Sequence, residues 1–265
     1  MRLPIYQADA FTSRIFGGNP AALVPFEQWP HNELLQRIAT ENNLSETAFT
    51  VPAEDGFELR WFTPAAEVPL CGHATLATAH LLWTQLGFSR NEIHFSTRSG
   101  LLTARREGDR IALDFPAQKL RSLKLESQFT APFAAEPREV LAEDADGGKL
   151  LLVFADAETV AALQPDFRAV AILPYQGIVC TAEGKGCDFV SRFFAPNVGI
   201  DEDPVTGSAH TLLTPFWAER LGKTAMQAQQ VSPRGGELEC ELQGERVILR
   251  GRAVTYLRGE IFIQE

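Results

Sequence analysis

The sequence lacks the features that mark several protein classes. Its cysteines, Cys71, Cys180, Cys187 and Cys240, show no C-x-x-C spacing, which argues against a disulfide scaffold and a zinc site. No stretch approaches the roughly 18 apolar residues of a membrane-spanning helix. The first residues, 1–6, have no apolar run typical of a signal peptide. We therefore expect a reduced, cytoplasmic protein with no membrane partner.

The sequence also has fewer basic than acidic residues. The chain has 24 Lys and Arg against 34 Asp and Glu, for a net charge of −10. Residues 1–118 carry 9 basic and 13 acidic groups, and residues 119–265 carry 15 and 21, so neither half is basic. Phosphate backbones need clustered Lys and Arg, so we expect no nucleic-acid partner. The 45% hydrophobic and 22% charged fractions are ordinary for a globular protein that buries a core.

One long pattern occurs twice in the chain. The first copy reads Arg60-Trp61-Phe62-Thr63-Pro64, Cys71-Gly72-His73-Ala74-Thr75 and Leu86-Gly87, and the second reads Arg192-Phe193-Phe194-Ala195-Pro196, Thr206-Gly207-Ser208-Ala209-His210 and Leu221-Gly222. The offset is 132 residues at the first element and 135 at the other two, so the second copy has three extra residues around 199–204. Two copies of this length predict two similar halves with a cleft between them, not a solenoid.

Each half reads as strands, one central helix, and strands again. Helical spacing covers residues 33–39, which Asn42-Asn43 should end, and apolar helices follow Gly72 and Gly207. Residues 46–51 alternate like a strand. This order predicts an α+β fold of two pseudo-symmetric lobes, residues 1–118 and 119–265, each a curved, mostly antiparallel sheet or barrel around a central helix. The final strand is free to pack back on the N-terminal lobe.

Two local features complicate this prediction. Pro215 falls inside the helix after Gly207 and should bend or end it, at a cost near ~3 kcal/mol in an unbroken interior. The glycines and Asn-Pro of residues 16–20 predict a loop.

The two helix starts are candidate anion sites. The first N–H groups of a helix have no internal partner, and the helix dipole attracts negative charge there. Gly72 and Gly207 allow a ligand to approach the backbone closely. Tight turns before helices explain one such glycine, but two at equivalent repeat positions favour a carboxylate-binding cleft.

Several side chains accompany these starts. His73 follows Gly72 and is placed to contact a ligand or to cap the helix. Asp203 belongs to the acidic loop Asp201–Asp203, and Ser208 is placed to cap its helix or bind a carboxylate. Glu46 begins an otherwise apolar strand and acts as a proton shuttle if it faces the cleft. A Ser208–His73–Asp203 triad is weakly supported, because Ser208 has no Gly-x-Ser-x-Gly surroundings.

Six ordered segments resemble the PhzF family of phenazine-biosynthesis-like proteins, which have the diaminopimelate epimerase fold. They are Asp9-Ala10-Phe11, Gly18-Asn19-Pro20-Ala21-Ala22, Ser45-Glu46-Thr47-Ala48-Phe49, Arg60-Trp61-Phe62-Thr63-Pro64, Cys71-Gly72-His73-Ala74-Thr75 and Asp203-Pro204-Val205-Thr206-Gly207-Ser208-Ala209. Together they span nearly the whole chain.

The resemblance implies an isomerase that moves a proton within a small carboxylate-bearing substrate. It places the family's acid/base on Glu46, and its other catalytic groups on His73 and Asp203. Substrate binding falls to Gly72, Gly207 and Ser208. The resemblance further implies no metal, no organic cofactor and a homodimer.

Two alternatives stay open. Sister epimerases use two cysteines, one before each helix glycine, whereas this chain has Cys71 at the first position and Thr206 at the second. A Cys71-dependent epimerase or racemase is therefore one alternative. A non-catalytic protein of the same fold that binds a small ligand is the other, since fold alone does not fix function.

Overall fold

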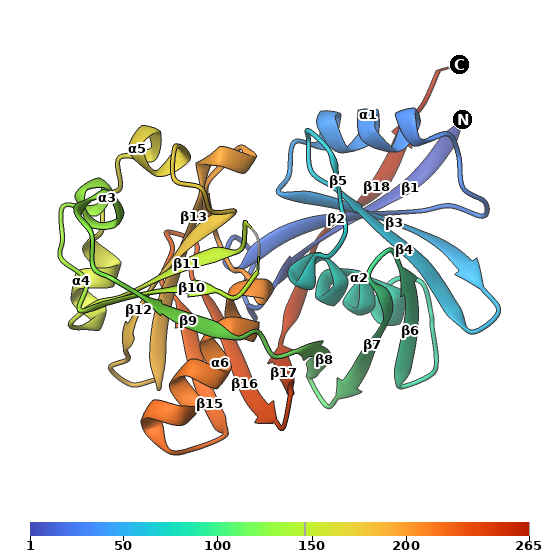
Figure 1. Cartoon of the computed structure of the whole chain (residues 1–265). Coiled ribbons are helices and arrows are strands. Elements are labelled where there is room, and N and C mark those ends of the chain that lie inside the picture. The colour runs from blue at the N-terminus through green and yellow to red at the C-terminus, as the bar shows by residue number, and fades with distance from the viewer. Residues whose placement is uncertain (146, 265) are drawn as a thin grey trace. The chain divides into compact units, whose positions relative to one another are not determined.

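The computed structural model describes residues 1–145 and 147–264. The chain forms two compact units, Met1–Asp114 with Arg250–Glu265, and Phe115–Leu249 (Figure 1). Each unit contains one sheet with helices on it, and each is described below by itself.

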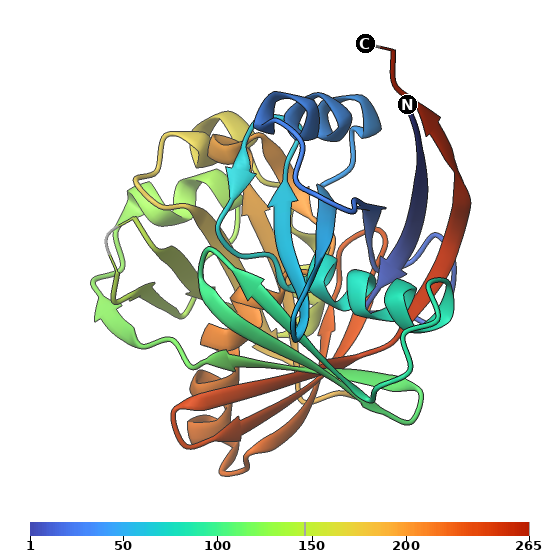
Figure 2. The same cartoon turned by 90° about the vertical axis from the view of Figure 1, so that its right-hand side faces the viewer.

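The first unit is built on eight complete strands and two helices. The chain runs β1 (Arg2–Ala10), β2 (Asn19–Pro25), α1 (Asn32–Asn42), β3 (Glu46–Ala53), β4 (Gly56–Phe62), β5 (Glu67–Val68), α2 (Gly72–Thr84), β6 (Glu92–Thr97), β7 (Gly100–Glu107), the start of β8 (Arg110–Pro116) and, from the end of the chain, β18 (Ala253–Phe262). The strands pair in the order β18-β1-β2-β3-β4-β6-β7, with β5 also on β4. Only β2–β3 and β4–β6 are parallel. Figure 2 shows β18 running beside β1.

The second unit repeats this plan. Its elements are β9 (Leu120–Leu123), α3 (Ser127–Thr130), η1 (Ala131–Phe133), β10 (Glu139–Glu143), β11 (Lys149–Val153), α4 (Ala157–Ala162), α5 (Phe167–Ala171), β12 (Gly177–Glu183), β13 (Phe189–Ala195), η2 (Pro196–Val198), β14 (Ile200–Asp203), α6 (Gly207–Leu221), β15 (Ala225–Gln230), β16 (Gly236–Gln243) and most of β17 (Arg246–Gly251). The pairing order β9-β10-β11-β12-β13-β15-β16, with β14 on β13, matches that of the first unit, including both parallel pairs. Strand β18 thus has in the first unit the place of β9 in the second.

Each central helix is buried on nearly all sides. In α2 the residues from Gly72 to Ala79 are buried, and the helix packs against β1, β2, β3 and β18. Ala, Thr and Gly dominate this segment, since small side chains let a curved sheet approach a helix closely. Helix α6 is buried in the same way. The predicted α+β architecture, with a sheet wrapped around one helix in each half, is confirmed.

Smaller helices cover the other face of each sheet. Leu35 and Ile38 of α1 join a buried cluster with Phe49 and Phe62. As predicted, α1 ends at the Asn pair, because Asn43 adopts the left-handed conformation (φ 48°) that asparagine tolerates. In the second unit, Val160 of α4 and Val170 of α5 contribute to the cluster around Phe194.

Of the two effects predicted for Pro215, ending the helix does not occur. Helix α6 continues through Pro215 to Leu221. Proline lacks the N–H that would bond the carbonyl four residues earlier, on Thr211. That carbonyl accepts a hydrogen bond from the backbone N–H of Gln118 instead, at 3.1 Å. Because the freed acceptor is satisfied, a main cost of an interior proline is avoided.

A bidentate ion pair precedes each central helix. Arg60 on β4 donates from Nε and Nη2 to the two carboxylate oxygens of Glu67 on β5, both at 2.8 Å. Arg192 on β13 makes the same two bonds to Glu202 on β14, at 2.7 and 2.8 Å. The arginines are 132 residues apart and the glutamates 135, so the three-residue insertion of the second copy lies between the ion-pair partners.

The acidic segment Asp201–Asp203 is therefore not the loop that the sequence predicts. It belongs to β14, which pairs with β13. Glu202 contacts Arg192, Asp203 is buried, and Asp201 is exposed. The strand forms because the buried arginine needs a carboxylate opposite it.

We predict that Arg192→Ala destabilises the protein strongly. Arg192 is 6% exposed and its Nη1 also donates to the carbonyl of Leu163 at 2.7 Å. Removing it leaves the Glu202 charge largely buried and unpaired, which typically costs about 3–5 kcal/mol. The measurement is the free energy of unfolding in urea. Lys185→Ala, which removes an exposed ion pair with Glu158, is the control and should leave the unfolding midpoint unchanged. Equal midpoints for both variants would contradict the prediction.

Candidate active site

The predicted site residues fall into two groups, one in each unit. Glu46, Gly72 and His73 lie together in the first unit. Asp203, Gly207 and Ser208 lie together in the second, around the start of α6. In each group the backbone at a helix start is flanked by a buried or mostly buried carboxylate.

Glu46 is the first residue of β3. Parallel pairing with β2 sets Glu46 beside Ala21. Just upstream, the side-chain amide of Asn42 donates to the Thr47 hydroxyl at 3.1 Å and ties the end of α1 to this strand. The Glu46 side chain is 12% exposed. The expectation that a carboxylate at a strand head points into water does not hold here.

His73 is the second residue of α2 and is 4% exposed. Its Nε2 lies 3.1 Å from Oε2 of Glu46. Its Nδ1 lies 3.1 Å from Nδ2 of Asn19 and 3.6 Å from Sγ of Cys71. Strand β2, strand β3 and the start of α2 therefore each present a polar side chain to one imidazole ring.

The surroundings of His73 act on its charge in opposite directions. Burial disfavours the imidazolium, but the Cys71 sulfur and the Glu46 carboxylate outweigh this and raise the pKa of His73 well above its usual range. The part of this pKa rise that comes from Cys71 requires its sulfur to be a thiolate. The thiol is neutral at physiological pH, so the Glu46 carboxylate is the group that favours the imidazolium.

Cys71 is the N-cap of α2 and is 7% exposed. Burial and the nearby Glu46 carboxylate raise the pKa of its thiol to about 11. Reactive cysteines have a lowered pKa and an electropositive, accessible setting. Cys71 has the opposite setting, which suits a small buried side chain more than a base.

Glu46, Cys71 and His73 offer three types of metal ligand, with one ligand atom of each within 4.8 Å of the others. The close contacts, however, use different ring nitrogens, since Glu46 lies at Nε2 and Cys71 at Nδ1. The lone pairs of these nitrogens point away from each other. One ion therefore does not suit all three residues in this arrangement.

In the second unit, Asp203 ends β14 and is 8% exposed. Its Oδ2 accepts a hydrogen bond from the Thr206 hydroxyl at 2.5 Å. Gln230, on β15, accepts the Thr206 N–H at 2.8 Å and donates to the Asp203 carbonyl at 2.7 Å. These bonds fix the segment that enters α6.

Helix α6 begins at Gly207, with Thr206 as its N-cap, and Ser208 is half-buried in its first turn. His210 is fully buried, and its Nδ1 donates to the Thr206 carbonyl at 2.8 Å. The equivalent residue in α2 is Thr75, whose hydroxyl donates to the Cys71 carbonyl at 2.5 Å. Both helices therefore stabilise the carbonyl of their N-cap residue from inside the first turn.

The second unit has no counterpart of the Glu46 carboxylate. Ala48 pairs with Trp61, and Val179 pairs with Phe193, at equivalent repeat positions. Two residues before Ala48 and Val179 lie Glu46 and Gly177, which therefore correspond to each other. Each is the first residue of its strand. A side chain at 177 would meet the Phe193 ring, at 2.3 Å from the added carbon.

Two polar residues of these groups had no role assigned from the sequence. Asn19, expected in a loop, instead begins β2, and that loop prediction is wrong for residues 19 and 20. Its place in the Gly-Asn-Pro motif was the available signal. No sequence pattern marks Gln230 as a site residue, because it is the last residue of an ordinary strand.

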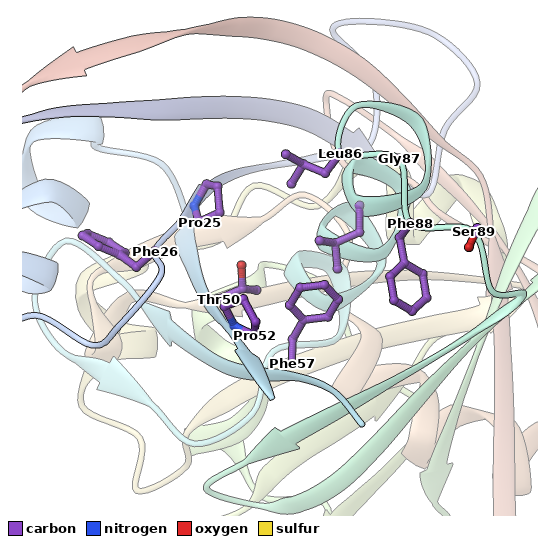
Figure 3. A pocket seen from close by; sticks show the side chains of 10 residues that line it. Pro25, Phe26, Thr50, Pro52, Phe57, Leu86, Gly87, Phe88 and Ser89 are labelled. Carbon is purple, nitrogen blue, oxygen red and sulfur yellow. The ribbon is translucent and has the colours of Figure 1, made fainter. Parts of the chain in front are cut away.

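An apolar cavity of about 400 Å³ lies at the other end of α2 (Figure 3). Its lining includes Phe26, Phe57, Leu86 and Phe88 and none of the predicted site residues. The helix is 13 residues long, so its two ends are separated by about 20 Å. This cavity offers no charged side chain for a carboxylate.

Comparison with known proteins decides the family. The PhzC-PhzF family model, described as phenazine biosynthesis-like protein, matches residues 8–259. The chain belongs to this family. It is 49% identical to an uncharacterized isomerase of Pseudomonas aeruginosa, over 99% of this chain and 100% of that protein. The crystal structure of a PhzF-family protein from Enterococcus faecalis matches with a TM-score of 0.95 and 43% identity, covering 99% of this chain and 100% of that one.

The PhzF fold also resembles that of more distant enzymes. A hydroxyproline epimerase from Agrobacterium vitis matches with a TM-score of 0.66 at 12% identity, covering 98% of this chain and 92% of that one, which shows a shared fold alone. The predicted epimerase-like fold is thus confirmed, and the relatives identify this PhzF-family chain as an isomerase. Among the described residues, no helix combines the length and apolar character needed to cross a membrane.

We predict that Cys71 resists alkylation in the folded protein. With a thiol pKa of about 11, only about one molecule in a thousand carries the thiolate at pH 8. Mass spectrometry after iodoacetamide treatment should find Cys187, which is partly exposed, modified well before Cys71. Rapid labelling of Cys71, with loss of activity, would contradict this prediction and favour the Cys71-dependent epimerase.

A pH dependence follows from His210. Burial lowers the pKa of His210 to about 4, against about 6.5 when unfolded. The unfolded chain therefore binds this proton first, and stability falls as pH drops from about 6.5 to about 4. Between pH 7 and pH 5 the wild type should lose about 2 kcal/mol more than His210→Gln in urea unfolding. His31→Gln, at an exposed histidine, should keep the wild-type slope, and parallel slopes for all three proteins would refute this assignment.

Proposed function

We propose that this protein is a cofactor-independent isomerase that moves a proton within a small carboxylate-bearing substrate, with Glu46 as general acid and base. The observation that carries the proposal is the mostly buried Glu46 carboxylate, 3.1 Å from His73 at the start of a central helix. A carboxylate held near the surface of the fold, yet shielded from water, is placed to take a proton and return it.

In this mechanism Glu46 removes a proton from a carbon of the substrate and redelivers it to a nearby carbon. His73 and Asp203 orient the polar groups of the substrate. The hydroxyl of Ser208 and the N–H of Gly207 bind its carboxylate, and Gly72 offers the same type of backbone donor. The helix dipole adds to this binding, since the N-terminal end of a helix carries partial positive charge.

The two groups of residues are proposed to contact the same substrate molecule, in a cleft between the lobes. Support comes from the repeat, which places a helix start and a carboxylate in each unit. It also comes from family membership, because Glu46, His73, Asp203 and Ser208 all fall on the motifs that resemble the PhzF pattern. Neither group alone supplies both an acid/base and an open carboxylate site.

A Cys71-dependent epimerase is the less favoured alternative. A racemase of that kind needs two thiols, one on each side of the substrate, and the equivalent of Cys71 is Thr206. The raised pKa of the Cys71 thiol also counts against it. A non-catalytic protein that binds a ligand has no need of a proton carrier at Glu46, which counts against that alternative. The homodimer and the cytoplasmic location stay predictions.

The central prediction concerns Glu46→Gln. We expect this variant to lose exchange of substrate protons with solvent by at least about 10²-fold, because the amide cannot accept the proton, while binding survives. The assay incubates the protein in D₂O with pooled amino, hydroxy and cyclic unsaturated carboxylic acids and follows the fading of C–H signals by NMR. Glu41→Gln, at an exposed glutamate of α1, is the matched control and should exchange like the wild type.

Two results would count against the proposal. Wild-type exchange in Glu46→Gln would remove Glu46 from the chemistry. Tight binding of an acid without any exchange, across the whole pool, would favour the non-catalytic alternative.

A further inference from the structure

Asn19 lies at the centre of the first group without a role in the mechanism above. It is fully buried, and its Nδ2 lies 3.1 Å from Nδ1 of His73. We propose that Asn19 is a positioning residue that keeps Nδ1 of His73 free of a proton, so that the proton resides on Nε2 and faces Glu46. The inference deepens the proposed function and rests on it for its catalytic consequence.

The hydrogen-bonding groups dictate this tautomer. An amide nitrogen only donates, so Nδ1 of His73 must accept and carries no proton. The proton of the neutral ring is then on Nε2, which lies 3.1 Å from Oε2 of Glu46. A neutral Cys71 thiol, 3.6 Å from Nδ1, is also able to donate to that nitrogen. Two donors from two elements therefore converge on one lone pair.

The backbone before Asn19 leaves it little freedom to move. Gly18 has φ +59°, and a side chain there would lie 2.0 Å from the carbonyl oxygen of Ala10. The Asp9 carboxylate accepts the N–H of Phe16 at 2.9 Å, and pairing of β1 with β2 sets Ala10 beside Asn19. The loop and the strand register together hold the amide against the ring.

The charged and titratable groups that face His73 within its unit are Glu46 from β3 and Cys71 from the helix start. Glu46 favours a second proton on the ring, while burial opposes it. A proton on Nδ1 would also place two donors against each other, because the Asn19 amide points its N–H there. Asn19 and burial thus both oppose the imidazolium, which the Glu46 carboxylate favours.

The catalytic consequence concerns where a transferred proton stays. Because Nε2 of His73 already carries a proton, it does not take the proton of Glu46, whose Oε2 lies 3.1 Å away. A proton that Glu46 removes from the substrate therefore remains on Glu46 and is available for return. Asn19 acts on this step only through His73, without contact to the substrate.

The test reads the His73 tautomer directly and needs no substrate. Long-range ¹H–¹⁵N NMR of protein labelled at histidine, recorded as a pH titration with His73→Gln for assignment, should show that the neutral ring of the wild type is the Nε2–H form. In Asn19→Asp the carboxylate accepts a hydrogen bond from Nδ1–H, so the ring should become protonated there and titrate at least about one pH unit higher. In Asn19→Leu, without a donor, an Nδ1–H form should appear.

Controls separate positioning from general structural damage. The other four of the 5 histidines report whether each variant is folded. Asn42→Ala removes a side-chain amide that bonds to Thr47 and not to His73, and it should keep the wild-type His73 spectrum. An Nδ1–H form of the neutral ring in the wild type would overturn the proposal, as would unchanged His73 signals in folded Asn19→Asp. Loss of exchange in Glu46→Gln tests the proposed function separately, since the tautomer does not depend on turnover.

Discussion

The ion pair that precedes each central helix is the constraint on which the two groups of candidate site residues depend. Arg60 and Arg192 come from the middle of their sheets, and their glutamate partners come from the short strand that leads into the helix. Bidentate bonds fix the planes of both groups, and burial makes an unpaired charge costly. The end of the short strand is therefore set, and with it the first turn of the helix. His73 and Ser208, the second residues of α2 and α6, owe their positions to this arrangement.

Local sequence patterns predicted much of this fold because the decisive interactions are local there. A glycine after a proline-containing segment and before an apolar run marked both helix starts, and the repeat predicted two similar halves. The features that local patterns did not predict depended on partners outside those patterns. Residues 201–203 form a strand because Arg192 requires a carboxylate. Pro215 is accommodated because the N–H of Gln118 reaches the carbonyl that the proline leaves free.

The candidate site was harder to predict for the same reason. A carboxylate at the head of a strand normally faces water, and only the resemblance to a family ranked Glu46 above its neighbours. Its contact with His73 joins elements 27 residues apart, through a parallel pairing that no short pattern shows. Asn19 is 54 residues from His73, and its Gly-Asn-Pro context suggested a turn. Burial of these polar groups in one place is a property of the folded sheet.

The two halves differ at positions of the candidate site. Where the first unit has Glu46, the second has Gly177, and the Phe193 ring fills the adjoining space. Where the first has Cys71, the second has Thr206. If the proposed acid/base Glu46 is the one proton carrier, hydrogen leaves and re-enters on the same face of a planar intermediate, in a suprafacial migration. Stereochemical inversion at one carbon, as in a racemase, needs a second base on the opposite face, and neither Gly177 nor Thr206, the counterparts of Glu46 and Cys71, offers a carboxylate or a thiol.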